Sequence, residues 1–319
     1  MKAIRVHSFG EPEVMKLEAA PDPKPGDGQL LVRVRAVGVN PVETYIRAGM
    51  YGPKPFPYTP GNDAAGVIEA VGPGVQTFRV GDRVYTDKTV SGSYAELTLC
   101  DQSYVHPLPQ KISFQQGAAI GIPGGTAWRG LFQRGAGVAG EIVLIHGATG
   151  GVGTAAVQLA RAAGMTVIAT SSSERGRKYA LEQGAHHAVD HDVTQRLDEV
   201  KALTGGIGFD LVLEMLADKN LASDLTALAR RGRVVVIGSR GRIEIDPRDT
   251  MGREADIRGL MLFGADEKEH RSMYAGLNAA MENGTFRPVI GMELPLAEAP
   301  KAHHEVMEGE SHGKIVLIP

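Results

Sequence analysis

The sequence predicts an α/β fold in which a doubly wound parallel sheet is inserted into a β-rich, partly open barrel domain. A glycine-rich turn between a short apolar run and a helical pattern lies near the middle of the chain. Strand and helix patterns alternate after residue 118, whereas short β-type runs separated by Gly and Pro precede it. A last apolar strand, 314–319, indicates a return to the first domain. We therefore expect a catalytic domain of residues 1–118 and 264–319 around a nucleotide domain of residues 119–263.

Short strands are predicted along the first domain. The first is Lys2–Val6. In Leu30–Val37, apolar side chains alternate with arginines, which is typical of a half-buried strand. Ala64–Val71 is followed by the turn Gly72-Pro73-Gly74. Short strands punctuated in this way favour a partly open barrel.

The glycine turn has the sequence of a dinucleotide-binding fingerprint. The run 141–145 is apolar and too short for a helix, and Ala148-Thr149-Gly150-Gly151-Val152-Gly153 follows it. Gly150 lets the backbone approach a pyrophosphate, and Gly153 lets the next helix pack closely on the strand. The free N–H groups of a helix N-terminus suit a diphosphate. We predict that this diphosphate is contacted by Thr149, Gly150, Gly151 and Val152; the alternative is a tight turn without a ligand.

Strand and helix units continue after the turn. We expect strands at 166–170, 211–213, 233–237 and 258–263, and helices at 174–183 and 220–231, the helices ending before Gly184 and Gly232. Units of this kind specify a doubly wound parallel sheet. An amphipathic helix is expected at 267–281.

The strand Thr166–Thr170 favours NADPH over NADH. NAD binders usually carry an acidic residue roughly 20 residues after the glycines, but this strand runs into Ser171–Ser173, whose small side chains leave room for a 2′-phosphate. Arg175, Arg177 and Lys178 follow directly, and a guanidinium matches phosphate geometry. These bases could also be only the solvated face of the next helix, and which of them binds the phosphate stays open.

Composition excludes several classes of function. The chain has 319 residues, a net charge of −3 and 43% hydrophobic residues, so nothing favours nucleic acid or an anionic membrane as a main partner. The one cysteine, Cys100, excludes an internal disulfide framework and indicates a reducing compartment. No stretch is apolar over the ~18 residues that a membrane span needs. We therefore expect a cytoplasmic protein.

Motifs along nearly the whole chain resemble those of the medium-chain dehydrogenase/reductase superfamily, and within it the zeta-crystallin type of NADPH:quinone oxidoreductase. Besides the glycine turn they are Gly38–Arg47, Pro57–Gly61, Gly66–Gly72, Gly81–Val84, Gly117–Pro123, Glu214–Ala217, Gly238–Gly241 and Pro247–Met251. The resemblance implies a GroES-like catalytic domain around a Rossmann domain. Two departures are Asn62, where relatives often carry Ser, and the three serines in place of a Gly-bearing turn.

Residue types argue against a catalytic zinc. Asn40 stands where the zinc-dependent relatives carry their first Cys, and Asn62-Asp63 stands where they carry His-Glu. An amide nitrogen is no zinc ligand, and a structural site would need four thiolates. The pairs His186-His187 and His303-His304 diverge on a strand or a helix, so we expect no metal role for either.

Direct hydride transfer to a quinone then remains, with alignment and exclusion of water as the protein's task. The segment Gly38–Arg47 resembles the family's cleft-lining segment, so Tyr45 and Asn40 are the first catalytic candidates. Tyr45 could donate a hydrogen bond to the quinone oxygen or contact the nicotinamide, or it could be ordinary packing. Tyr51 and Thr126 are weaker candidates. A phenol of pKa ~10 is a poor acid at pH 7, so Tyr45 is not assigned essential proton transfer.

The resemblance also implies further cofactor contacts beyond the carboxyl ends of the strands. With Tyr45, Arg175 and Lys178 they are Ser172, His191, Asn220, Ile237, Gly238, Ser239, Arg240, Leu260, Met261 and Leu262. Family members commonly dimerise by joining strands at an edge such as 260–262, so we expect a homodimer, or else a tetramer.

Three functions remain open at this point. The first is NADPH-dependent reduction of quinones, with ortho-quinones favoured. The second is NADPH-dependent reduction of an enone or alkenal double bond, which needs the same hydride delivery. The third is a cofactor-binding structural or RNA-binding role, as in some zeta-crystallin relatives, although the lack of a basic stripe argues against RNA as the main partner.

Overall fold

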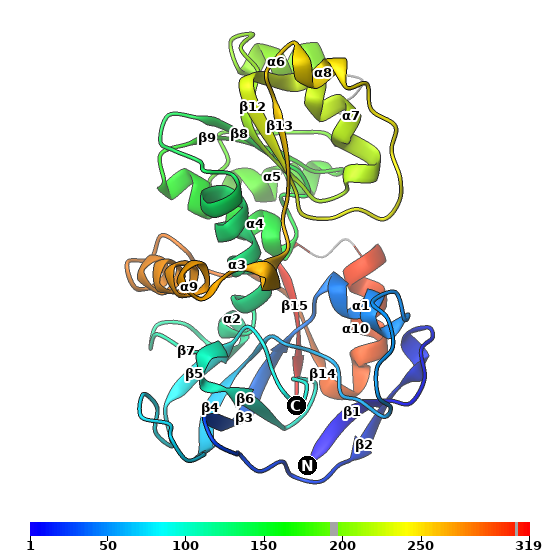
Figure 1. Ribbon diagram of the computed structural model, residues 1–319, viewed down its shortest axis with the longest axis vertical. Coiled ribbons are helices and arrows are strands. Elements are labelled where there is room, and N and C mark those ends of the chain that lie inside the picture. Colours follow the sequence, from blue (N-terminus) through cyan, green and yellow to red (C-terminus); the bar gives the residue numbers. More distant parts are fainter. Residues whose placement is uncertain (192–196, 310–311) are drawn as a thin grey trace. The chain divides into compact units, whose positions relative to one another are not determined.

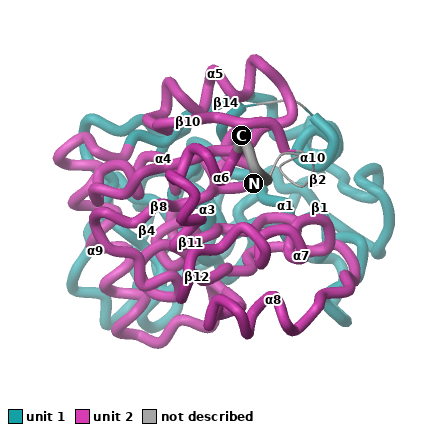
Figure 2. Tube along the Cα trace, turned by 90° about the horizontal axis from the view of Figure 1, so that it is seen from above, with its two compact units in different colours: residues 1–123, 287–319 teal, residues 124–286 magenta. Residues whose placement is uncertain are grey.

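The computed structural model describes residues 1–191, 197–309 and 312–319. The chain forms two compact units, which Figure 2 shows in two colours. Unit 1 contains residues 1–123 and 287–319, and unit 2 contains residues 124–286. Along the sequence, unit 2 is therefore inserted within unit 1. The predicted nucleotide domain spanned residues 119–263, so the structure assigns a longer C-terminal part to the inserted unit.

Unit 1 is built around a seven-stranded sheet. Its strand order is β14-β15-β3-β4-β5-β7, and β6 also pairs with β3. Within this sheet only β14 and β15 are parallel; the other pairs are antiparallel, and β1 and β2 form a separate antiparallel pair. The elements are β1 (Lys2–Val6), β2 (Met15–Ala19), β3 (Gln29–Gly38), α1 (Pro41–Arg47), β4 (Ala64–Val71), β5 (Arg83–Thr86), β6 (Leu97–Asp101), β7 (Val105–Pro107), α2 (Phe114–Gly117), β14 (Ile290–Pro295), α10 (Ala299–Glu308) and β15 (Lys314–Ile318).

The predicted strands of unit 1 are confirmed. Strand β4 has the predicted bounds, and β3 extends the predicted strand by one residue at each end. The closing strand β15 pairs with β3, Val316 opposite Gly38, so the end of the chain does return to the first domain. Both termini lie in this unit (Figure 1). One core cluster of this unit contains residues of both chain segments, among them Ile4, Tyr94, Ala302 and Leu317.

Unit 2 contains a six-stranded, fully parallel sheet in the order β10-β9-β8-β11-β12-β13, whose strands can be followed in Figure 1. The order starts at β8 in the middle and grows outward on both sides, which confirms the doubly wound sheet. The elements are α3 (Gly121–Trp128, which begins in unit 1), η3 (Arg129–Arg134), β8 (Ile142–Ile145), α4 (Gly151–Ala162), β9 (Thr166–Thr170), α5 (Glu174–Glu182), β10 (His187–Val189), α6 (Leu197–Leu203), β11 (Phe209–Glu214), α7 (Ala217–Ala227), β12 (Leu228–Val236), α8 (Arg248–Met251), β13 (Asp256–Gly259), η5 (Leu262–Gly264) and α9 (Glu267–Glu282). Ligands of such sheets lie beyond the carboxyl ends of the strands, near the reversal between β8 and β11.

Several predicted elements of unit 2 differ from the structure in their bounds. The strand predicted at 233–237 is β12, which already begins at Leu228 and ends at Val236. The helix predicted at 220–231 is α7, which begins at Ala217 and ends at Ala227, because β12 already starts at the next residue. The strand predicted at 258–263 ends at Gly259, opposite Val236. Since β12 itself ends at Val236, the residues after Gly259 have no strand to pair with and enter the short helix η5 instead.

Helix α9 belongs to unit 2, which explains why this unit extends to residue 286. The indole ring of Trp128 packs so closely on the backbone of Gly276 that a Cβ there would collide with it. Arg129 Nη1 donates to Glu269 Oε2 at 2.8 Å. Met273, Tyr274 and Leu277 bury the apolar face of the helix. No helix of the part described here is long and apolar enough to cross a membrane.

Candidate nucleotide and active sites

The glycine turn after β8 is open where a diphosphate would approach and closed where the helix packs. Gly150 is the N-cap of α4, with φ −77° and ψ 174°. A Cβ on Gly150 would meet only the carbonyl oxygen of Gly147, at 3.7 Å. A Cβ on Gly153 would collide with that carbonyl and lie 2.6 Å from Cα of Ala148. These are the two roles that the fingerprint assigns to its glycines.

The end of β9 presents hydroxyl and basic side chains. Ser171 is buried, Ser172 is exposed, and the Ser173 hydroxyl caps α5 by accepting from the Gly176 N–H at 3.0 Å. Arg177 is engaged: its Nη1 donates to Asp190 Oδ2 at 2.8 Å and to the Ser171 carbonyl at 3.2 Å.

Arg175 and Lys178 differ from Arg177 in their surroundings. Both are exposed on the first turns of α5, and neither forms an ion pair with any residue of the described ranges. Of the three bases that the sequence offers for a 2′-phosphate, Arg175 and Lys178 are thus exposed, whereas Arg177 is half-buried and engaged with Asp190.

Three ionisable side chains meet beneath the carboxyl ends of β8 and β11, and we call them the buried acid cluster: His146, Glu214 and Asp224. His146 Nε2 lies 2.9 Å from Asp224 Oδ1 and 3.5 Å from Glu214 Oε2. All three are almost fully buried. Burial raises the pKa of Glu214 to about 7, against the opposing effect of His146. Burial disfavours the charged form of His146, but Asp224 and Glu214 outweigh it and raise its pKa.

The buried acid cluster holds two residues predicted to contact the cofactor. Thr170 Oγ1 lies 3.3 Å from His146 Nδ1 and 2.8 Å from His191 Nδ1. Asn220 Nδ2 donates to Glu214 Oε1 at 3.2 Å. Sequence reasoning missed the cluster, although His146 and Glu214 both stand at carboxyl ends of predicted strands, where ligands bind.

The cluster's ligand atoms lie within 4.8 Å of one another, which is close enough to hold a metal ion. The hydrogen bond between His146 and Asp224 already satisfies the imidazole nitrogen that would face such an ion. The imidazole is thus held by hydrogen bonds within the protein, while Glu214 Oε2 and Asp224 Oδ2 have no hydrogen-bond partner among the described residues.

The loop after β12 carries four predicted cofactor contacts, Ile237 to Arg240. The Gly238 carbonyl accepts from the Ala217 N–H at 2.9 Å, and the Arg240 N–H donates to Asp218 Oδ1 at 2.7 Å. Ser239 and Arg240 are exposed.

The three residues after β13 differ in exposure. Met261 is exposed, Leu260 is half-buried and Leu262 is buried, in a turn rather than in the predicted strand. Thr126 is buried in α3 of this unit.

Unit 1 has a polar pocket of about 100 Å³. Its lining includes Glu43, Lys54, Tyr58, Asn62, Thr89 and Val90. The predicted catalytic residues Tyr45, Asn40 and Tyr51 are not among the lining residues. Tyr45 is half-buried on α1, and Tyr51 is 59% exposed in the loop after α1. Glu43, two residues before Tyr45, was missed from the sequence.

A network of buried polar side chains lies behind this pocket. Lys314 Nζ donates to Asn40 Oδ1, and lies 3.4 Å from Asp63 Oδ2. Asn40 Nδ2 in turn donates to Asp63 Oδ2 at 2.9 Å and to Glu43 Oε1 at 3.3 Å. The ammonium can only donate, so the Asn40 amide must direct its oxygen to Lys314 and its nitrogen to the two carboxyl groups. The amide is thus fully engaged inside the protein.

Burial sets the charge state of this network. It raises the pKa of Glu43 to about 7 and raises that of Asp63, while Lys314 opposes both shifts. It also lowers the pKa of Lys314, against the effect of the two carboxyl groups. Burial lowers the pKa of His303 to about 3, which keeps that imidazole neutral.

The donor set at this position does not fit a catalytic zinc. By the family resemblance, Asn40 stands where zinc-dependent relatives carry a Cys, and Asn62-Asp63 stands where they carry His-Glu. The buried ammonium of Lys314 contacts both Asn40 and Asp63. The ammonium of Lys314 donates hydrogen bonds to the oxygen lone pairs with which these side chains would otherwise bind a metal ion.

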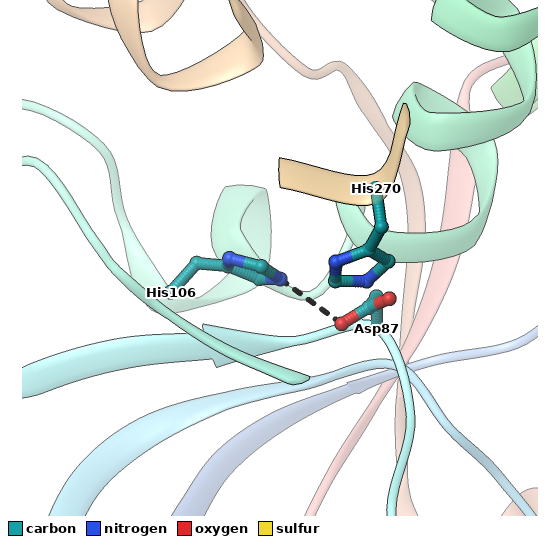
Figure 3. Close-up of side chains that lie close together, drawn as sticks. All are labelled: Asp87, His106 and His270. Atoms are coloured by element: carbon teal, nitrogen blue, oxygen red, sulfur yellow. Dashed lines mark hydrogen bonds and ion pairs between the residues drawn. The ribbon is translucent and has the colours of Figure 1, made fainter. Parts of the chain in front are cut away.

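A second buried acid–imidazole pair lies at the β5–β7 edge of unit 1. His106 Nε2 lies 3.0 Å from Asp87 Oδ1, as Figure 3 shows. The pair forms because β5 and β7 run antiparallel, with Thr86 opposite Val105. The His106 ring also lies against Tyr85, with 5.0 Å between ring centres. Nothing in the local sequence indicates this pairing, since 19 positions separate the two residues.

Comparison with known proteins gives family matches for both units. Residues 26–110 match the family model described as alcohol dehydrogenase GroES-like domain, and residues 151–278 match that described as zinc-binding dehydrogenase. A quinone oxidoreductase of Homo sapiens is 50% identical over 100% of this chain and 98% of its own length.

Solved structures with the same fold include an NAD-dependent alcohol dehydrogenase and a quinone oxidoreductase of Escherichia coli complexed with NADPH. The first is 30% identical with a TM-score of 0.94, the second 27% identical with a TM-score of 0.91, and both matches cover 100% of each chain. From the full-length identity, the glycine turn and the paired domain matches, the chain belongs to the quinone oxidoreductase family of the medium-chain dehydrogenase/reductase superfamily.

Proposed function

We propose that this protein reduces quinones with NADPH as the hydride donor, and that ortho-quinones are its preferred substrates. The observation that carries the cofactor assignment is the end of β9, where exposed Ser172 is followed along the chain by exposed Arg175 and Lys178 and no acidic side chain takes the position expected in NAD binders. The quinone oxidoreductase relatives and the NADPH complex of the Escherichia coli protein support it. The ortho-quinone preference rests on the family resemblance.

Bound NADPH supplies a hydride and needs no Lewis acid when the acceptor is a quinone. The residues of this chain would bind NADPH and orient it toward the quinone. The open N-terminus of α4 at Gly150 would hold the diphosphate with the N–H groups of Gly151 and Val152 beside Thr149, and Arg175 with Lys178 would hold the 2′-phosphate.

The remaining proposed contacts complete the site. His191 and Asn220 are held in place by Thr170 and Glu214, respectively. Ile237, Gly238, Ser239, Arg240, Leu260, Met261 and Leu262 are proposed as the further cofactor contacts of unit 2. In unit 1, Tyr45 remains the proposed hydrogen-bond donor to the quinone or the nicotinamide.

The double variant Arg175→Ala/Lys178→Ala is expected to reduce kcat/KM for NADPH about tenfold or more and to leave that for NADH unchanged. Each hydrogen bond to a charged group contributes about 1.5–3 kcal/mol, and 1.4 kcal/mol corresponds to a factor of ten. The measurement is the initial rate with 9,10-phenanthrenequinone at several NADPH and NADH concentrations.

Arg271→Ala is the matched control for this experiment, because Arg271 is an exposed base of the same unit that pairs with Glu267. It should keep the parent preference for NADPH. A parent protein that prefers NADH would contradict the assignment of the Ser171–Lys178 segment. A parent that reduces alkenals faster than any quinone would replace the proposed substrate class.

We also propose that the protein is a cytoplasmic homodimer. Strand β13 is the edge of the unit 2 sheet, with Ile257 41% exposed, and the exposed side chains of Met261 and Phe263 follow it. An exposed strand edge flanked by such apolar side chains can pair with a second copy. Light scattering after gel filtration distinguishes a dimer from a monomer or a tetramer.

A further inference from the structure

A quinone that accepts a hydride also needs a proton. The hydride carries two electrons from the C–H bond of the nicotinamide, and the quinone becomes a hydroquinone anion. One O–H bond of an acid must break to deliver a proton to the anionic oxygen, which yields hydroquinone and NADP⁺. The alternative acceptors, enones and alkenals, also need one proton for each hydride. The residues assigned so far include no acid for this step.

We propose that Glu43 is this acid, and that Tyr94 and His303 form the hydrogen-bonded chain that positions it. The proposal rests on the proposed quinone reduction and adds a catalytic residue to it. Glu43 is the carboxyl group that lines the pocket of unit 1.

The two oxygens of Glu43 are held unequally. Oε2 accepts from the Asn40 backbone N–H at 2.8 Å and from the Tyr94 hydroxyl at 2.8 Å. Among the described residues, Oε1 accepts one bond, at 3.3 Å from Asn40 Nδ2. Oε2 is therefore the more firmly held oxygen, and Oε1 is the one left to bond a substrate or a single bridging water that enters the pocket beside this 2%-exposed side chain.

The chain continues from Glu43 into the protein. The Tyr94 hydroxyl lies 3.1 Å from His303 Nε2, and its ring meets the imidazole edge-on at 5.7 Å between centres. Tyr94 is fully buried, and His303 Nδ1 has no hydrogen-bond partner among the described residues. The neutral imidazole can donate to or accept from the phenol, so the phenol can face Glu43 as an acceptor when the carboxyl group is protonated and as a donor when it is ionised.

The surroundings of Glu43 keep both of its protonation states accessible at neutral pH. Burial raises its pKa to about 7, Lys314 and the Asn40 N–H oppose this, Asp63 adds to it and the Tyr94 hydroxyl lowers it. A general acid is most effective when its pKa lies near the working pH. Because the acid must carry a proton, kcat should fall as the pH rises through this value.

A purely structural role for Glu43 must be separated from this one. Glu43 is residue N3 of α1 and forms a capping box with Asn40. Gln at N3 forms the same capping box. Glu43→Gln therefore keeps the helix cap and removes the ionisable group, while its amide nitrogen replaces the oxygen that accepts from Asn40 Nδ2.

The experiment measures kcat for 9,10-phenanthrenequinone between pH 5.5 and 9 at saturating NADPH, and the NADPH affinity by fluorescence titration. Glu43→Gln is expected to lower kcat about a hundredfold, the usual size of a general-acid contribution. It should also remove the fall of kcat above pH 7 and leave the NADPH affinity unchanged. Glu69→Gln, an exposed carboxyl group of the same unit paired with Arg33, is the matched control and should keep the parent profile.

Tyr94→Phe gives a readout that a structural role would not move. It removes the hydroxyl that lowers the pKa of Glu43, so the inflection of kcat should move to higher pH. A Glu43→Gln protein with the parent kcat and pH profile overturns the inference while the parent's activity upholds quinone reduction. A parent protein that does not oxidise NADPH in the presence of quinones would contradict both the proposed quinone reduction and the role of Glu43.

Discussion

Replacing Gly150 with Val is expected to abolish NADPH binding while the thermal stability of the protein stays close to that of the parent. The backbone at Gly150 has extended dihedral angles, which β-branched residues adopt without strain. A Cβ at this position would contact only the Gly147 carbonyl oxygen, at 3.7 Å. The added side chain would instead occupy the space that a diphosphate needs to reach the helix N-terminus. Loss of two hydrogen bonds from backbone N–H groups to the charged diphosphate, at about 1.5–3 kcal/mol each, corresponds to an affinity for NADPH about a hundredfold weaker or more.

Gly153→Val is the matched comparison, with the same substitution three residues further on. Its Cβ would collide with the Gly147 carbonyl and press on Ala148, so the helix would have to move off the turn. Overpacking of this kind costs typically about 1–3 kcal/mol, so the melting temperature should fall. Fluorescence titration with NADPH and thermal unfolding of both variants check the pair. Undiminished NADPH binding by folded Gly150→Val would place the diphosphate elsewhere.

Lys314→Met should lower the free energy of unfolding at pH 7 by about 3–5 kcal/mol, which is the usual cost of removing one partner from a buried charge pair. The ammonium is buried and contacts Asn40 and Asp63, and it opposes the burial that raises the pKa of Glu43 and Asp63. Without it, two carboxyl groups share a buried site with no cation.

The loss of stability in Lys314→Met should grow as the pH rises. A carboxyl group whose pKa is raised in the folded state destabilises the fold as the pH rises above its ordinary value, and Lys314→Met raises both values further. Urea unfolding should therefore show a larger loss of stability at pH 7 than at pH 4, because lowering the pH favours the neutral form of both carboxyl groups. Lys301→Met, an exposed lysine paired with Glu298, is the control and should change stability little. An equal loss at both pH values would contradict the role of the ammonium as counter-charge.

The sequence and the structure agree most closely where local pattern alone decides the backbone. The strands at 64–71 and 166–170 have their predicted bounds, because apolar runs between turn residues specify both ends. The glycine turn was also predicted with its distinct roles for Gly150 and Gly153. The strand expected at 258–263 was wrong, because its length is set by where its neighbour β12 ends, at Val236.

By itself, the sequence determined the fold class, the glycine turn and the family, since each is carried by motifs of residues close together in the chain. Only the tertiary structure brought Glu43, Tyr94 and His303 together behind one pocket, with Asp63 and Lys314 beside them. These residues come from five separate segments of the chain, and their spacing in the sequence does not indicate proton transfer. Their shared chemistry arises from common burial, which shifts the pKa of each group through the charges around it, and burial exists only once the chain has folded.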